Sequence, residues 1–460
     1  MKNNNSIQTE FTMKKLAAWL KEHNITEVEA VISDFTGIAR GKIMPSSKFL
    51  AEAGIRLPES VLIQEVTGDY VDDSVYDDLI SNTEMDMVLK PDQNAIHRVT
   101  WALEATALVI HDCYSKEGEP VEMAPRNLLK KVLALYSEKG WTPVVAPELE
   151  FYLTRTSDNP DYPLQPPVGR SGRPESGRQS YSIDAANEYD PLFEDVYDWC
   201  EAQGLDIDTL IHEEGAAQME INFRHGDALS LADQVFIFKR TVREAALKHG
   251  INATFIAKPI SHQPGSSMHL HQSILDDKGN NIFTLRNGND SKMLHHYVGG
   301  LQKYLLEAMP LFAPNVNSYR RFLSYTSAPV NLAWGIDNRT AGLRIPDSTP
   351  ENRRIENRIA GADVNPYLAF VGSLLCGYLG MVEEIEPSRM ITGSAYDESS
   401  IERLPLNLEE ALERMENSDI MKQALGSQFV KAFVEVKRAE HQNFKQVISS
   451  WEREYLQLTV

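Results

Sequence analysis

The stretch Gln218-Met219-Glu220-Ile221-Asn222-Phe223 alternates strictly between polar and apolar side chains. A period of two is typical of a β-strand, because successive side chains of a strand point to opposite faces of the sheet. The apolar half of the stretch is expected to face a core, and the Gln, Glu and Asn side chains a second surface. Such strands usually show their polar face to water, so this stretch alone does not define a functional site.

The same alternation returns at three other places, and each time it presents ionisable side chains on one face. These stretches are Glu148-Leu149-Glu150, His269-Leu270-His271 and Arg354-Ile355-Glu356-Asn357-Arg358-Ile359, and Glu213 precedes the turn into the first stretch. The recurrence of Glu, His and Arg predicts one shared polar surface. For a single pair such as Glu356 with Arg358, an ordinary salt bridge on the strand is the favoured interpretation.

Several glutamates on one surface need counter-charge, because two unit charges about 4 Å apart repel by about 4 kcal/mol at an effective dielectric of 20. Ligands that are carboxylate oxygens with one imidazole and no thiolate suit Mg²⁺ or Mn²⁺ better than Zn²⁺. Arginine forks match phosphate oxygens, and five arginines lie near these strands in the sequence: Arg321, Arg339, Arg344, Arg354 and Arg358. The combination predicts a phosphoryl-transfer site.

The composition excludes several classes of protein. A net charge of −21 over 460 residues argues against nucleic-acid binding and favours the attraction of cations. The three cysteines show no CxxC spacing, and the polar N-terminus lacks the apolar run of a signal peptide, so we expect a reducing, cytoplasmic location. The apolar segment from Tyr367 to Val382 is interrupted by glycines and is too short to span a membrane, which predicts a buried core helix.

Two loops allow more than one interpretation. Residues 65–86 are rich in Asp and Glu, which fits either a solvated loop or a binding segment. Residues 158–180 hold many prolines and three arginines, which fits either a lid near bound phosphates or a mobile surface loop.

Helices alternate with strands along the chain, and some strands are expected to be antiparallel, which predicts an α+β fold with a curved sheet flanked by helices. A helix is expected over residues 12–23. A loop at residues 115–122, with Gly118 and Pro120, predicts a domain boundary. We therefore expect a small N-terminal domain of residues 1–117 and a catalytic domain of residues 118–460.

Six ordered motifs between Pro147 and Tyr367 resemble those of the glutamine synthetase family, and the overall match runs from about residue 15 to residue 450. They are Pro147-Glu148-Leu149-Glu150; His212-Glu213 with Gln218-Met219-Glu220; Gly265 with Met268-His269-Leu270-His271-Gln272-Ser273; Asn331-Leu332-Ala333-Trp334-Gly335; Asn338-Arg339-Thr340 with Arg344-Ile345-Pro346; and Arg354-Ile355-Glu356-Asn357-Arg358 with Asn365-Pro366-Tyr367. The segments from Arg178 to Tyr181, Asp195 to Trp199 and onward to Asn222 look most like the γ-glutamylpolyamine synthetase branch.

The resemblance implies a β-grasp N-terminal domain, a mainly antiparallel catalytic sheet, and a ligase in which ATP phosphorylates the γ-carboxyl of glutamate before an amine displaces phosphate. One Mg²⁺ or Mn²⁺ would bind Glu150, Glu213 and Glu220, and another Glu148, His269 and Glu356. Gly265, Arg321 and Arg358, with Glu150, would hold glutamate. Arg339 and Glu356 would act in catalysis, Arg339 and Arg344 would meet the transferred phosphoryl group, and His271, Ser273, Arg344 and Arg354 would bind ATP.

The resemblance also implies a homo-oligomer of twelve subunits, in which a neighbour's N-terminal domain completes each site. Members that use ammonia carry a Glu before Ala-Pro that accepts a proton from ammonium, whereas this chain has Ser327 before Ala328-Pro329. An Asp of the N-terminal domain that helps to bind ammonium corresponds here to Gln64. Asp69, with Tyr70, Asp72 and Asp73, is a candidate to bind the distal cation of a polyamine.

The loss of two carboxylates weakens a pocket for ammonium and makes room, so the expected substrate is a primary amine, above all a polyamine such as putrescine, cadaverine, spermidine or spermine. The alternatives are an ammonia-using glutamine synthetase and a ligase for a monoamine such as ethanolamine. An inactive member acting as a nitrogen sensor or scaffold is disfavoured, since all six metal positions are present.

Overall fold

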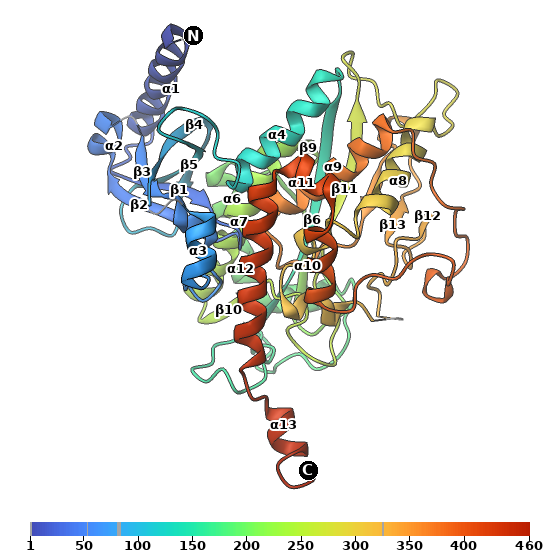
Figure 1. The fold of residues 1–460 in the computed structure, drawn as a ribbon. Helices are drawn as coiled ribbons and strands as arrows, with labels where there is room; N and C mark the ends of the chain where they lie inside the picture. The colour runs from blue at the N-terminus through green and yellow to red at the C-terminus, as the bar shows by residue number, and fades with distance from the viewer. Residues whose placement is uncertain (1, 53, 81–83, 324–325) are drawn as a thin grey trace.

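The computed structural model describes residues 2–52, 54–80, 84–323 and 326–460. Two β-sheets organise this part of the chain, one from the N-terminal residues and one from the remainder (Figure 1). The predicted α+β class is confirmed by this arrangement.

The N-terminal sheet has five strands in the order β2-β1-β5-β4-β3. Its strands are β1 (Glu27–Ser33), β2 (Ala39–Pro45), β3 (Ile55–Pro58), β4 (Asp86–Val99) and β5 (Thr106–Tyr114). The central β1–β5 pair is parallel and its neighbours are antiparallel, as expected for a β-grasp domain. Helix α1 (Lys2–Glu22) buries Leu16 and Leu20, and it begins ten residues before the helix predicted over residues 12–23. Once one turn has formed, helix extension costs little, which explains the earlier start.

The larger sheet has nine strands, with the path β12-β13-β14-β11-β6-β8-β7 and with β9 and β10 paired to β6. The strands are β6 (Thr142–Arg155), β7 (Ile207–His212), β8 (Gln218–Phe223), β9 (Gly226–Asp227), β10 (Ile251–Thr254), β11 (Met268–Leu275), β12 (Trp334–Ile336), β13 (Leu343–Ile345) and β14 (Ile355–Asn357). Every pairing is antiparallel except β12 with β13, so the sheet is mainly antiparallel as predicted.

Helices surround these sheets, and the most apolar of them is buried. The helices after α1 are α2 (Ser46–Glu52), α3 (Asp73–Leu79), α4 (Pro125–Glu138), α5 (Ile183–Ala186), α6 (Asp190–Gln203), α7 (Ala228–Lys248), α8 (Lys292–Tyr304), α9 (Pro366–Val382), α10 (Leu408–Glu416), α11 (Asp419–Leu425), α12 (Ser427–Lys445) and α13 (Ser450–Tyr455). Helix α9 packs against α4, α7 and α8, which confirms the predicted core helix. Among the described residues, no helix combines the length and hydrophobicity needed to cross a membrane.

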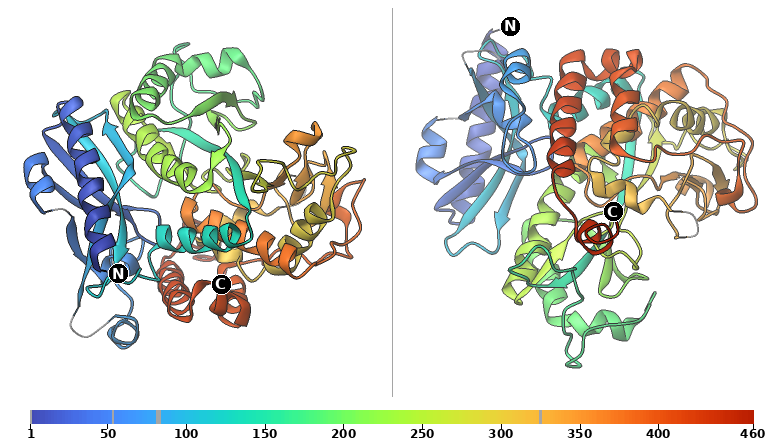
Figure 2. Two further views of the ribbon diagram at one scale, coloured as in Figure 1. Left: turned by 90° about the horizontal axis from the view of Figure 1, so that it is seen from above. Right: turned by 60° about the horizontal axis from the view of Figure 1, so that its bottom comes forward.

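The N-terminal sheet stands beside the larger one (Figures 1 and 2), and α12 runs along the junction between them (Figure 1). Gln428 of α12 donates to the carbonyl of Leu79, and Asn443 donates to Glu65. The predicted boundary after residue 117 lies between β5 and α4, and the division into two domains stays a prediction.

A buried ion cluster around Arg126 joins the two parts. The guanidinium of Arg126, at the start of α4, contacts Asp92 of β4, Asp112 of β5 and Asp233 of α7. The arginine side chain is only 5% exposed, and Tyr367 of α9 donates a further hydrogen bond to Asp233. Because one cation compensates several buried carboxylates, its removal would leave them unpaired.

Replacing Arg126→Met is therefore expected to lower the free energy of unfolding by about 3–5 kcal/mol. The matched control is Lys130→Met, since Lys130 also contacts Asp112 but is 40% exposed, and its loss is expected to cost less than about 1 kcal/mol. Urea denaturation followed by circular dichroism measures both values. Equal stability of the two variants would contradict this role of Arg126.

Candidate functional site

Strand pairing assembles the ionisable stretches into one row across the larger sheet. Residues paired on adjacent strands have their side chains on the same face. The pairs, in order across the sheet, are Glu220 with Glu150, Asn222 with Glu148, Glu148 with His269, His271 with Glu356, and Glu356 with Arg344. The shared polar surface predicted from the alternation is thus present, and its Glu220 is buried rather than solvated.

Apart from His271, this row lines a cavity of about 950 Å³. Its wall includes the segment around Ser327, the turn after β7 and the end of the long loop that precedes α5. The lining residues with predicted roles are Glu148, Glu150, Glu213, Glu220, Gly265, His269, Arg321, Ser327, Arg339, Arg344, Glu356 and Arg358.

A second cavity, of about 590 Å³, adjoins the first at Glu148 and Asn222. It is lined by three of the residues predicted to bind ATP, His271, Ser273 and Arg354. The fourth, Arg344, lines the first cavity instead. The two cavities together have room for a nucleotide beside a smaller substrate.

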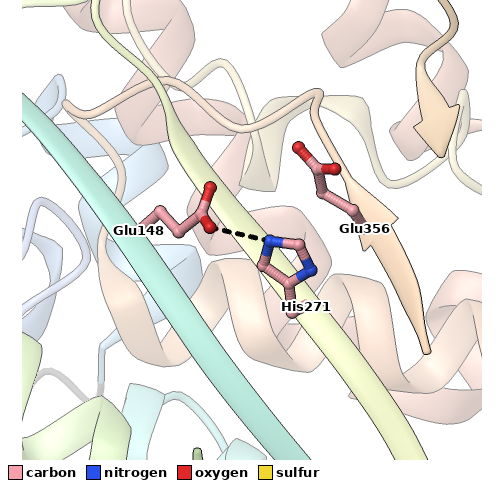
Figure 3. Close-up of side chains that lie close together, drawn as sticks. All are labelled: Glu148, His271 and Glu356. Carbon is pink, nitrogen blue, oxygen red and sulfur yellow. Dashed lines mark hydrogen bonds and ion pairs between the residues drawn. The ribbon is translucent and has the colours of Figure 1, made fainter. Parts of the chain in front are cut away.

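Two imidazoles and two carboxylates meet where the cavities join. His269 Nδ1 lies 3.4 Å from Glu148 and 3.7 Å from Glu356. His271 Nε2 lies 2.9 Å from Glu148, and Figure 3 shows this pair with Glu356 beside it. The ligand atoms of Glu148, His271 and Glu356 lie within 4.8 Å of one another, as do those of Glu148, Glu220 and His269. His271, predicted for the nucleotide, therefore also borders the metal-ligand set.

Hydrogen bonds from imidazoles and the charge of a guanidinium hold Glu148 and Glu356, respectively, in their charged forms. Burial favours the neutral form of Glu148, but hydrogen bonds from His269 and His271 outweigh it and lower the carboxyl pKa. Burial acts in the same way on Glu356, and the charge of Arg358 is the main counterweight, so that its pKa falls to about 2. Arg358 and Arg344 both donate to Glu356, which confirms the predicted Glu356–Arg358 salt bridge.

Glu150, Glu213 and Glu220 form no ion pair within the described part of the chain. Burial and the nearby charge of Glu213 raise the pKa of Glu150 to about 7, although Ser267 donates two hydrogen bonds to it. Burial also raises the pKa of Glu220, and four surrounding glutamates add to the effect. Burial raises the pKa of Glu213 as well. This end of the row has surplus negative charge.

The arginines face the same cavity, and several of their nitrogens have no partner. The Nε atoms of Arg321, Arg344 and Arg358 are buried and lack a hydrogen-bond acceptor among the described residues. Burial lowers the pKa of Arg321 to about 10, which leaves it charged at neutral pH. Unpaired guanidinium donors beside a cavity are suited to an anionic ligand such as a carboxylate or phosphate.

Gly265 lies against Arg321 so closely that no side chain fits. A Cβ on Gly265 would lie 2.5 Å from Arg321 Cγ and 2.7 Å from the carbonyl oxygen of Ala257. The glycine that the family resemblance places at the glutamate site therefore makes room for the arginine.

The predicted amine site is only partly assembled within one chain. Ser327 is exposed at the cavity, in a left-handed conformation with φ of +62°, and Tyr325 of the same motif lies outside the described residues. Gln64 donates to Tyr70 and to the carbonyl of Gly68, and neither Gln64 nor the exposed Asp69 lines the cavity.

Comparison with known sequences assigns the chain to a family. The catalytic domain of glutamine synthetase matches residues 122–456. The chain belongs to the glutamine synthetase family. Members of this ligase family use ATP and divalent metal ions.

Glutamine synthetase-family relatives with different named substrates have similar identities to this chain. The gamma-glutamylputrescine synthetase of Escherichia coli is 32% identical, with 94% of this chain and 92% of the relative covered. A glutamate–isopropylamine ligase of a Pseudomonas species is 31% identical, with 95% and 96% covered. The glutamine synthetase of Pyrococcus abyssi is also 31% identical, with 92% of each chain covered.

A solved glutamine synthetase-type fold superposes on most of the chain. The structure titled as a GmaS complex with ADP is 27% identical, with a TM-score of 0.82 and coverage of 95% of this chain and 98% of that one. The predicted family and fold are therefore both confirmed.

The residues present fit the divalent metals that the family uses. Glu150, Glu213 and Glu220 supply hard oxygen ligands whose raised pKa values reflect burial and unbalanced charge, which a cation would neutralise. His269 contacts both Glu148 and Glu356, so these three can act together at a second position.

Sequence reasoning missed a residue that supports this end of the family site. Glu175, in the long loop, accepts hydrogen bonds from His212 Nε2 at 3.0 Å and from the backbone N–H of Ala217 at 2.7 Å. Ala217 has a left-handed φ of +57°, in the turn that joins Glu213 to β8. An irregular loop has no periodic pattern that would single out Glu175. Only the abundance of charged residues in that loop could have suggested a role for it.

Glu220→Gln tests whether charge repulsion at the family's metal site destabilises the metal-free protein. The pKa of Glu220 lies above its ordinary value of 4.5, so the carboxyl destabilises the folded state increasingly as pH rises above 4.5. In excess chelator we expect the variant to melt at a higher temperature than the natural chain near pH 8, with the difference shrinking toward pH 4.5.

Added Mg²⁺ is expected to raise the melting temperature of the natural chain more than that of Glu220→Gln, and the variant should lose turnover. Differential scanning fluorimetry and phosphate release provide the two readouts. Full turnover of the natural chain in excess chelator, or identical melting of both proteins at every pH, would contradict the metal assignment.

Proposed function

We propose that this protein joins the γ-carboxyl of glutamate to a polyamine such as putrescine, cadaverine, spermidine or spermine, at the expense of ATP and in the service of polyamine utilisation. The observation that carries the proposal is Ser327 at the rim of the main cavity, where ammonia-using relatives are expected to have a glutamate. The similarity to a gamma-glutamylputrescine synthetase supports it.

We propose that the substrates lie against separate walls of the two cavities. Glutamate would lie at Gly265 and Glu150, with its carboxylates facing Arg321 and Arg358. The nucleotide would occupy the second cavity along His271, Ser273 and Arg354. Arg339 and Arg344 would then face the phosphoryl group at the junction, where bidentate guanidinium donors stabilise developing negative charge.

We further propose that Glu150, Glu213 and Glu220 hold one Mg²⁺ or Mn²⁺ and that Glu148, His269 and Glu356 hold another. When bound, these ions supply positive charge that offsets the repulsion among the carboxylates and the phosphates. The pairing of Glu356 with Arg344 and Arg358 keeps its carboxylate ionised and oriented for this role.

The reaction proceeds in two displacements. A γ-carboxylate oxygen of glutamate attacks the terminal phosphorus of ATP, which releases ADP and forms γ-glutamyl phosphate. The neutral amine nitrogen then attacks the acyl carbon, phosphate leaves, and the nitrogen loses a proton. Because Ser327 has no carboxylate to accept that proton, water or another base must take it.

A phosphate-release assay with glutamate, ATP and a panel of amines tests this function. We expect putrescine or a longer polyamine to give a kcat/KM at least about tenfold above that of ammonium, since an extra charge-assisted contact contributes about 1.5–3 kcal/mol. Ser327→Glu restores a carboxylate and removes space, so it should shift the preference toward ammonium, and Ser327→Ala is the matched control without added charge. If the natural chain used ammonium as well as any polyamine, glutamine synthetase would be the better assignment; a preference for ethanolamine would favour a monoamine ligase.

We also propose that the protein is a homo-oligomer, with twelve subunits as the expected number, in which Gln64 and the acidic segment of residues 65–86 approach Ser327 of a neighbour. The support is that Gln64 and Asp69 do not line the cavity of their own chain. Light scattering is expected to give a mass many times that of the 51.8 kDa chain. A monomer with full activity would refute this assembly.

A further inference from the structure

One carboxylate of the main cavity has no part in the proposed metal and glutamate sites. Six glutamates line the cavity among the described residues, and five of them are assigned above. The sixth, Glu214, follows Glu213 in the turn between β7 and β8, and its side chain is 28% exposed. It is a carboxylate open to both the cavity and solvent.

The present partner of Glu214 is a weakly held cation. Arg178 Nη1, from the long loop, donates to Glu214 Oε1, and the arginine side chain is 68% exposed. An ion pair this exposed contributes little stability because water screens it and the long side chain loses freedom. A cationic ligand can therefore take the place of the guanidinium at small cost.

Lys258 is a second cation near Arg178, and it makes the position of Arg178 less favourable. Burial lowers the pKa of Lys258, and the charge of Arg178 lowers it further. Movement of Arg178 away from Glu214 can therefore relieve a repulsion as well as free a carboxylate.

The loop backbone around Arg178 is anchored on both sides. Before it, Glu175 binds His212 and the Ala217 N–H. After it, the Tyr181 N–H donates to the His212 carbonyl at 2.8 Å. The arginine side chain can leave while Ser180 and Tyr181 stay in the cavity wall.

We propose that Glu214 binds the distal ammonium group of a linear diamine or polyamine and that Arg178 occupies this position when no amine is bound. The proposal rests on the function proposed above and adds the residue that distinguishes a diamine from a monoamine. The reacting nitrogen lies toward Ser327, and the exposed ring of Tyr181 offers a surface for the methylene chain between the two nitrogens. Glu214 belongs to the same chain and cavity as Ser327, so this recognition needs no neighbouring subunit.

The test compares putrescine with pentylamine, which has a methyl group in place of the second ammonium. The quantity measured is the ratio of their kcat/KM values for the natural chain and for two variants that each replace a charged side chain by the neutral amide of glutamine. We expect Glu214→Gln to lower the ratio about tenfold, because a charge-assisted contact is lost. Arg178→Gln is expected to raise the ratio, because the competing cation is gone.

Substrate recognition by Glu214 predicts opposite changes of the ratio in the two variants. If Glu214 and Arg178 formed only a structural salt bridge, its loss would move the ratio in the same direction in both variants. Added salt should reduce the ratio for the natural chain and leave it unchanged for Glu214→Gln. Thermal melting of each variant checks that it folds, and Glu214→Asp should recover part of the ratio.

An unchanged ratio in Glu214→Gln, or changes of the same sign in both variants, overturns the role of Glu214 while leaving the polyamine ligase intact. If phosphate is released with ammonium but with neither putrescine nor pentylamine, the proposed function fails and this inference fails with it.

Discussion

Mutual repulsion among buried carboxylates is the constraint on which the rest of the site depends. Strand pairing places Glu150 directly beside Glu220 and sets Glu148 one step further along the sheet. At one end of the row, arginines and histidines balance the charge, and the pKa of Glu356 falls to about 2. At the other end the described residues form no ion pair with Glu150, and its pKa rises to about 7. The site is divided into a self-balanced half and a half that favours added cations.

The alternation of polar and apolar residues made much of this site predictable. Strand periodicity is local, so it could assign Glu148, Glu220 and His269 to polar faces without knowledge of the fold. The order in which the strands pair is not local. That His271 would stand opposite Glu356, and so border both the metal-ligand set and the nucleotide cavity, follows only from the β11–β14 pairing.

Loop residues mark the limit of prediction from sequence. Glu175 and Glu214 have no periodic context, and their contacts join segments about 40 residues apart. The family was predictable because six ordered motifs lie between Pro147 and Tyr367, and the fold class because helices alternate with strands along the chain. The geometry of the proposed amine pocket was not predictable from the sequence, because it depends on the conformation of an irregular, proline-rich loop. Local rules do not determine that conformation.

The junction between the two cavities also bears on the order in which products can leave the site. They share Glu148 and Asn222, and each is lined by exposed residues of its own, such as Ser327 in one and Glu351 in the other. Each cavity of the single chain therefore has an exposed wall of its own. If the nucleotide and the amide occupy the two cavities as proposed, neither product has to pass through the site of the other to leave, so the single chain imposes no fixed order of release.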